Sequence, residues 1–270
     1  MPEISELLDQ VVPQEELPTD TVAVFCGDLR SGRPDPVAHD VHVVTVSPWA
    51  PAGSTARSVP LDPARVATLT RHVRGQRYAV TCWTESQAEQ VLAKTGRDRL
   101  AAAGVAPLLV ETEELLVQGI VTGRARNGHA AFDGWRERAE RSAFRDIAVT
   151  RSLGDAEGSV EDAVGQLASG DLHSAVLSAR KAFGHTVDAL LEGQGSYGTY
   201  TPEWRARRVR EVAPKALGFD EYWAIETMSG LRVENSREWV GSVLSVCRRL
   251  LAEQPEHLVR GALRGPRRGW

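Results

Sequence analysis

Two apolar runs near the N-terminus, joined by a polar segment that contains Gly27 and Gly32, give the clearest structural pattern in the chain. The first run, residues 22–26, reads VAVFC and has the length and β-branched content of a buried strand. The second run, residues 41–46, is preceded by Asp40 and carries His42 among valines. Because side chains alternate between the two faces of a strand, Asp40 and His42 are predicted to share one face.

Shorter apolar patterns complete the first half of the chain. A leading helix is predicted over residues 4–12, and further strands over residues 58–61 and 78–83. Asp62 followed by Pro63 is typical of a helix start, and apolar residues follow at helical spacing, so a helix is expected there as well. Those apolar residues are Val66, Leu69 and Val73, and further helices are expected over residues 86–103 and from Glu111.

From about residue 130 the apolar positions follow a helical period throughout. Helices are predicted over residues 135–150, 159–169, 172–191, 222–228 and 239–251, with another from Thr201. The expected fold is α/β followed by α. A small mixed β-sheet domain occupies residues 1–128, an all-helical bundle domain residues 129–258, and a basic flexible tail residues 259–270.

The segment between the two apolar runs resembles a motif of the nucleotidyltransferase superfamily related to DNA polymerase β, which includes kanamycin nucleotidyltransferase-type enzymes. In that family a strand leads into Gly-Ser, a hydrophobic residue, two variable positions and Gly, and a later strand carries Asp-hydrophobic-Asp. Gly27, Leu29 and Gly32 match the glycines and the hydrophobic position, and Asp40 and Val41 match the first aspartate and its spacer. The chain departs from the motif at Asp28, in the serine position, and at His42, in the second aspartate position.

The resemblance implies a role for each matched position. Asp40 and His42 would occupy the metal site and, with Asp28, the catalytic positions, where the family holds two Mg²⁺ ions for nucleotidyl transfer. The turn would bind the phosphates of a nucleoside triphosphate (NTP) through residues Gly27, Leu29, Arg30, Ser31 and Gly32. The family also has a third carboxylate on a following strand, but only Arg57, Ser58 and Asp62 lie near the strand predicted at 58–61.

The two departures leave two functions open. Histidine is a poor substitute for a carboxylate around Mg²⁺, and Asp28 places negative charge where a triphosphate would lie. The first possible function is that of a nucleotidyltransferase, which uses Mg²⁺ and an NTP to modify a small hydroxylated substrate, as in secondary metabolism. The second possibility is a diverged protein that needs no cofactor. It would bind a nucleotide, a metabolite or a protein partner, or would use Asp40 and His42 as an acid/base pair.

A group of arginines in the helical half is the other candidate site. Arg205 and Arg208 lie close to Trp204, and guanidinium groups suit phosphate oxygens, so these residues and Lys181 are candidate substrate-binding residues. The alternative is a solvated helix face that is ion-paired with the nearby Glu203 and Glu211.

The composition of the chain limits the classes of partner that it is expected to bind. The chain of 270 residues has a net charge of −4 and a pI near 6.0, which argues against a nucleic-acid partner. Three widely spaced cysteines suit a reducing compartment. No apolar run is long enough to span a membrane and no export signal is visible, so a cytoplasmic protein without membrane contact is expected. A small-molecule substrate is the expected partner, and a homodimer is left open.

Overall fold

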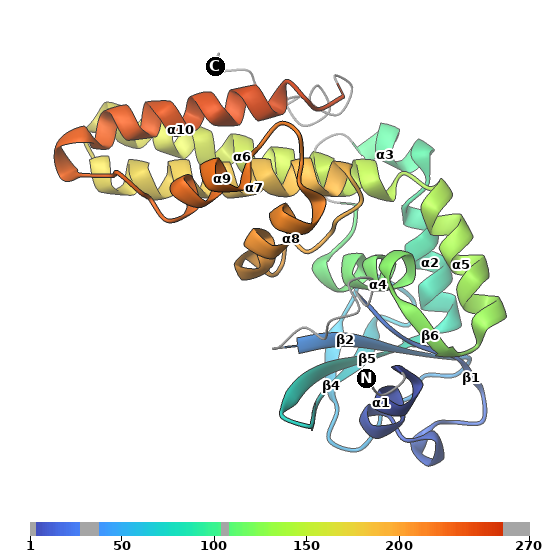
Figure 1. The fold of residues 1–270 in the computed structure, drawn as a ribbon. Helices are drawn as coiled ribbons and strands as arrows, with labels where there is room; N and C mark the ends of the chain where they lie inside the picture. The colour runs from blue at the N-terminus through green and yellow to red at the C-terminus, as the bar shows by residue number, and fades with distance from the viewer. Residues whose placement is uncertain (1–3, 28–37, 104–107, 256–270) are drawn as a thin grey trace. The chain divides into compact units, whose positions relative to one another are not determined.

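The computed structural model describes residues 4–27, 38–103 and 108–255, and the chain divides into two compact units (Figure 1). The first unit comprises residues 1–101 and 108–144, and the second comprises residues 102–107 and 145–270. The main division therefore falls later than the boundary at 128 expected from the sequence, because helix α5 (His129–Arg141) packs on the sheet of the first unit. The predicted tail at 259–270 lies outside the described residues.

A mixed six-stranded sheet forms the first unit, as the sequence predicted. The strand order is β3-β4-β5-β2-β1-β6, with β2 and β5 parallel and the other neighbours antiparallel. The strands are β1 (Thr21–Cys26), β2 (Ala38–Thr45), β3 (Thr55–Ser58), β4 (Arg65–Val73), β5 (Gln76–Thr84) and β6 (Arg124–Asn127). The short turn η1 (Gln14–Glu16) precedes β1.

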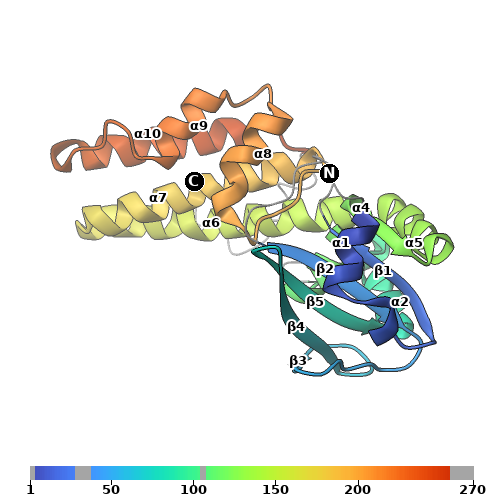
Figure 2. The same cartoon turned by 60° about the horizontal axis from the view of Figure 1, so that its bottom comes forward.

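Helices cover both faces of this sheet (Figures 1 and 2). One face packs on α1 (Ile4–Val11), where Leu8 and Val11 join a buried cluster with Val41 and Val43 of β2. The other face packs on α5 and on α2 (Glu85–Lys94) and α4 (Glu111–Thr122). Since side chains alternate along β2, Asp40 and His42 lie on this second face, together on one face as predicted.

The sequence interpretation of residues 62–73 is wrong. Residues 65–73 form strand β4 instead of a helix, and β4 pairs along its length with β5. The apolar spacing fitted a helix, but the segment is rich in valine and threonine, and long-range pairing decides between the two structures. Asp62 caps no helix. Its backbone N–H donates to Gln90 Oε1 (3.0 Å) and its carbonyl accepts from Gln90 Nε2 (2.6 Å).

Three smaller boundaries also differ from the sequence prediction. The third strand spans residues 55–58 instead of 58–61, and the helix predicted over 86–103 is divided at Gly96 into α2 and α3 (Arg97–Ala103). In the second unit, α6 runs unbroken through residue 159, where the sequence predicted that a helix begins, and the Ser159 hydroxyl donates back to the carbonyl of Asp155.

The second unit is helical, as predicted, and is organised around α7. This helix packs along α10, and its buried residues Ala179, Phe183 and Leu190 belong to a cluster that also includes side chains of α8, α9 and α10. The helices are α6 (Phe144–Ser169), α7 (Leu172–Gly193), α8 (Arg205–Val212), α9 (Phe219–Glu226) and α10 (Ser236–Leu251), with short turns η2 (Pro202–Trp204) and η3 (Val233–Asn235).

Candidate functional site

The glycine after β1 and the acid on β2 are adjacent. The backbone N–H of Gly27 donates to the carbonyl oxygen of Asp40 at 2.9 Å. A Cβ at position 27 would lie 3.3 Å from the Cα of Gly119 on α4, so a glycine allows the turn to approach this helix. The remaining motif positions predicted to bind nucleotide or to act in catalysis, Asp28, Leu29, Arg30, Ser31 and Gly32, lie outside the described residues.

His42 is a core residue of the interface between the sheet and α4. Its side chain is almost fully buried, and its Nδ1 accepts a hydrogen bond from Trp83 Nε1 at 3.3 Å. The ring lies directly against Gly119, where a Cβ would approach Cδ2 and Nε2 of His42 to 2.8 Å. The face of the ring is also close to Phe25, with 5.1 Å between ring centroids.

These contacts set the protonation state of His42. Burial lowers the pKa of His42 to about 4, and the backbone of Leu115 offsets this only in part, so the imidazole is neutral near pH 7. Its Nδ1 lone pair is already used by Trp83, and its Nε2 edge faces α4. This geometry does not fit the metal-ligand and catalytic roles expected for His42 from the sequence.

The sheet places small and hydroxylated side chains beside Asp40 and His42. Strand register puts Ala79 of β5 and Thr70 of β4 in one row with Asp40. The row of His42 continues through threonines on the three neighbouring strands, which are Thr81, Thr68 and Thr55. A further carboxylate that shared a metal with Asp40 would be expected on the adjacent strand β5, where the chain has Ala79 and Thr81.

The donors around Asp40 therefore do not fit a pair of magnesium ions. Magnesium prefers several hard oxygen ligands in octahedral geometry, and two-metal sites are built from clustered carboxylates. Within residues 4–27, 38–103 and 108–255, no group of three His, Cys, Asp or Glu side chains is arranged to hold a metal ion.

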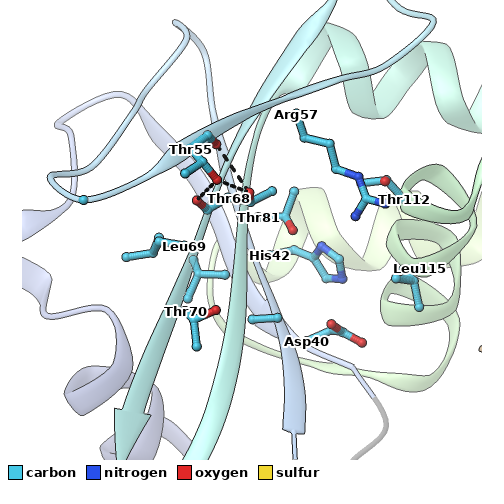
Figure 3. Close-up of a pocket in the computed structure, with 13 residues that line it drawn as sticks. Asp40, His42, Thr55, Arg57, Thr68, Leu69, Thr70, Thr81, Thr112 and Leu115 are labelled. Carbon is cyan, nitrogen blue, oxygen red and sulfur yellow. Dashed lines mark hydrogen bonds between the residues drawn. The ribbon is translucent and has the colours of Figure 1, made fainter. Parts of the chain in front are cut away.

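A pocket of about 290 Å³ lies over these rows, on the face of the sheet that α4 covers (Figure 3). Its floor is formed by β2, β3, β4 and β5, and α4 contributes Thr112 and Leu115 to its wall. The hydroxyls of Thr55 and Thr68 lie 3.2 Å apart and form a hydrogen bond. The other described lining residues are Asp40, His42, Gly53, Arg57, Leu69, Thr70, Ala79, Val80 and Thr81.

Arg57 is a functional candidate that the sequence analysis did not single out. Its guanidinium lies 3.6 Å from the carboxylate of Glu111, and both side chains are about half exposed, so this ion pair is weak. Figure 3 shows the guanidinium beside Thr112, with His42 between it and Asp40. The sequence signal for this pocket was the spacing by two residues of Thr55 and Arg57, and of Thr68 and Thr70, which is typical of one face of a strand. Because residues 62–73 were predicted to be a helix, Thr68 and Thr70 were not interpreted in this way.

Arg205 and Arg208 form a buried ion-pair network within the second unit. Arg205 donates to both carboxylate oxygens of Asp188, at 3.0 and 2.8 Å, and Arg208 donates to the same carboxylate at 2.9 Å. Asp188 is fully buried and both arginines are nearly so. Gly184 makes room for the Arg205 guanidinium, which would lie 2.8 Å from a Cβ at that position. The open anion clamp expected from the sequence is thus replaced by internal charge pairing.

The neighbouring candidates have different surroundings. Trp204 is partly buried beneath the guanidinium of Arg207, 5.8 Å from the ring centroid, and Arg207 pairs with Glu211 at 2.7 Å. This agrees with the ion-paired helix face that the sequence left as an alternative. Lys181 is exposed on α7. The substrate-binding roles of Trp204 and Lys181 stay predictions.

A second buried carboxylate lies one turn further along α7. Glu192 accepts hydrogen bonds from Arg151 and Ser152 of α6, both at 2.7 Å, and from the Thr199 hydroxyl. Burial raises the pKa of Glu192 to about 7, although Arg151 opposes the shift. These contacts hold the segment after α7 against α6.

Comparison with solved structures gives a nucleotidyltransferase-like protein from Exiguobacterium sibiricum, with a TM-score of 0.51 and 12% identity. The match covers 96% of this chain and 78% of that chain. No family model matches the chain, and no curated protein does. The chain therefore has a nucleotidyltransferase-like fold, in which a sheet unit is followed by a helical unit. The kanamycin-type likeness stays a prediction.

None of the helices in the described part of the chain combines the length and apolar character that crossing a membrane requires.

The burial of His42 predicts a pH-dependent contribution to stability. Because the folded-state pKa is below the ordinary value of 6.5, this contribution is present above about pH 6.5 and is lost as the pH falls toward 4. We expect a loss of roughly 3 kcal/mol in unfolding free energy over that range. His42→Gln should remove this slope in urea unfolding measured from pH 4 to 7, and His72→Gln, at an exposed position of β4, should keep it. An unchanged slope in His42→Gln would contradict the assignment.

The network around Asp188 predicts a large effect of a small change. Asp188→Asn removes the carboxylate that two buried guanidinium groups share, leaves Arg205 with the more distant Glu226 (3.7 Å), and should lower the unfolding free energy by roughly 3–5 kcal/mol. Glu211→Gln, which removes an exposed partner of Arg207, should cost less than about 1 kcal/mol. Denaturant unfolding measures both. Equal, small effects would mean that Arg205 and Arg208 remain available to bind an anionic substrate.

Proposed function

We propose that this chain is a diverged protein of the nucleotidyltransferase-like fold that binds a small polar metabolite in the pocket over β2, β5, β4 and β3. In this proposal it has lost the two-metal transfer of a nucleoside monophosphate. The observation that carries the proposal is the absence of a second carboxylate beside Asp40 among the described residues of the pocket. On the adjacent strand β5, Ala79 lies next to Asp40 and Thr81 lies next to His42.

The pocket itself supports a binding role. At about 290 Å³ it lies at the lower end of the range for small-molecule sites, and it combines hydroxyl groups with one leucine wall and a few charged groups. Threonine hydroxyls can both donate and accept hydrogen bonds, which suits a ligand with several polar atoms. The neutral state of His42 removes it as a charged acid at neutral pH and supports a role in holding α4 against the pocket floor.

Nucleotidyl transfer is the second candidate function, favoured by the contact of Gly27 with Asp40 and by the fold. It requires magnesium ions that link the triphosphate to the protein. The residues described around Asp40 offer one carboxylate, and the position of the second one holds a buried histidine whose Nδ1 is already hydrogen-bonded.

Calorimetry with ATP separates the two functions. We expect no gain in ATP affinity when MgCl₂ is added to the full-length chain. His42→Asp, which restores the acid of the family motif, should lower stability without creating magnesium-coupled binding, because the new carboxylate would be buried against Gly119. His42→Asn serves as the uncharged control. Magnesium that tightens ATP binding tenfold or more in the wild-type protein would favour nucleotidyl transfer.

A pocket-filling variant tests the proposed binding site. Ala79→Phe places an aromatic ring between Asp40 and Thr70, and Ala56→Phe adds the same ring at an exposed position of the edge strand β3. In a thermal-shift survey of sugars, sugar phosphates, amino acids, amines and nucleotides, compounds that stabilise the wild-type protein should not stabilise Ala79→Phe. They should still stabilise Ala56→Phe. Stabilisation that survives in Ala79→Phe would overturn the proposed site.

A further inference from the structure

We propose that the pocket takes a dipolar ligand, a small metabolite with an ammonium group at one end and an oxyanion at the other. The proposal rests on the proposed function and names the class of compound that the same site would bind. It follows from the sign and the position of the two charged residues among those that line the pocket.

The two charges have opposite sign and lie at opposite ends of the pocket. Among the described lining residues, Asp40 is the carboxylic acid and Arg57 the guanidinium, and burial keeps His42 neutral. Both side chains are at the same face of the sheet, and His42 lies between them (Figure 3). A ligand with several negative charges would find one cation here and would be repelled by Asp40, whereas a ligand with one charge of each sign would be attracted at both ends.

Strand register shows that the two residues are far apart on the sheet. The row of His42 contains Thr55, and Arg57 lies two residues beyond Thr55 while Asp40 lies two residues to the other side of His42. Each of these steps along the strands is roughly 7 Å, and β4 and β5 lie between β3 and β2, which adds three strand spacings of about 4.8 Å across the sheet. An α-amino acid holds its ammonium and carboxylate groups too close together to reach both residues. The geometry therefore favours a ligand in which several bonds separate the two charges.

The surface between the charges suits the middle of such a ligand. Leu115 offers an apolar wall from α4, Thr112 contributes a hydroxyl from the same helix, and Thr81 contributes one from the sheet. A methylene chain would pack on the leucine, and a hydroxyl or amide on that chain would find hydrogen-bond partners. The weak surface pair of Arg57 with Glu111 leaves the guanidinium able to exchange its partner for a ligand oxyanion.

A chain-length series tests the proposal. Glycine, 4-aminobutanoate, 6-aminohexanoate and 2-aminoethyl phosphate would be titrated into the full-length protein by ligand-observed NMR, with hexanoate and hexylamine as singly charged controls. We expect a longer amino acid to bind at least tenfold more tightly than either control, and glycine to bind least. The phosphate compound distinguishes a carboxylate from a phosphate as the preferred oxyanion.

Two variants assign the ends of the ligand. Asp40→Asn should reduce the affinity for the best amino acid to that of hexanoate, and Arg57→Gln should reduce it to that of hexylamine. Asp133→Asn and Arg71→Gln are matched controls, because Asp133 is exposed on α5 and Arg71 pairs with Glu16, away from the pocket. Both controls should bind as the wild-type protein does, and circular dichroism would check that all four variants are folded.

The results separate this proposal from the one on which it rests. If compounds of the wider survey bind and Ala79→Phe blocks them, but the amino acids show no advantage over the singly charged controls, the dipolar class is overturned and the binding site stands. The same follows if Asp40→Asn and Arg57→Gln leave the affinity unchanged. If Ala79→Phe blocks no compound, the proposed function itself fails.

Discussion

The contact between His42 and Gly119 is the constraint on which the candidate site depends. Because Gly119 has no side chain, α4 can approach β2 closely enough to enclose the imidazole, whose Nδ1 accepts from the indole of Trp83. This packing uses a position beside Asp40 that would otherwise be open to a ligand or a metal ion. It also seats Thr112 and Leu115 of α4 at the wall of the pocket. The contact between β2 and α4 thus buries the His42 side chain and also positions the α4 residues that line the pocket.

In the helical unit, too, packing buries polar side chains and pairs them with partners from other segments. Asp188 and Glu192 are one turn apart on α7 and fully buried, and each is surrounded by donors from other segments. Arginines that look like an anion clamp in the sequence are the partners of Asp188. Burying charges is costly unless they are paired, so these groups specify how α8 and the segment after α7 pack on α7.

The fold and the function therefore have different support. A nucleotidyltransferase-like neighbour at 12% identity agrees with a mixed sheet followed by helices. Function depends on a handful of side chains grafted on that fold. In this chain the side chains beside Asp40 are alanine, threonine and a buried histidine, and the opposite end of the pocket carries Arg57. The proposed binding function rests on those residues.

Local patterns in the sequence determined the strands β1, β2 and β5, the helical second half, and the common face of Asp40 and His42, because period and residue type depend on near neighbours alone. Only the tertiary structure decided that residues 65–73 form a strand, since their partner β5 supplies the hydrogen bonds. It likewise decided that His42 is neutral and that Arg205 is paired, because burial and distant partners such as Trp83 and Asp188 set their state. A residue's type can be read along the chain, but its environment exists only once the chain has folded.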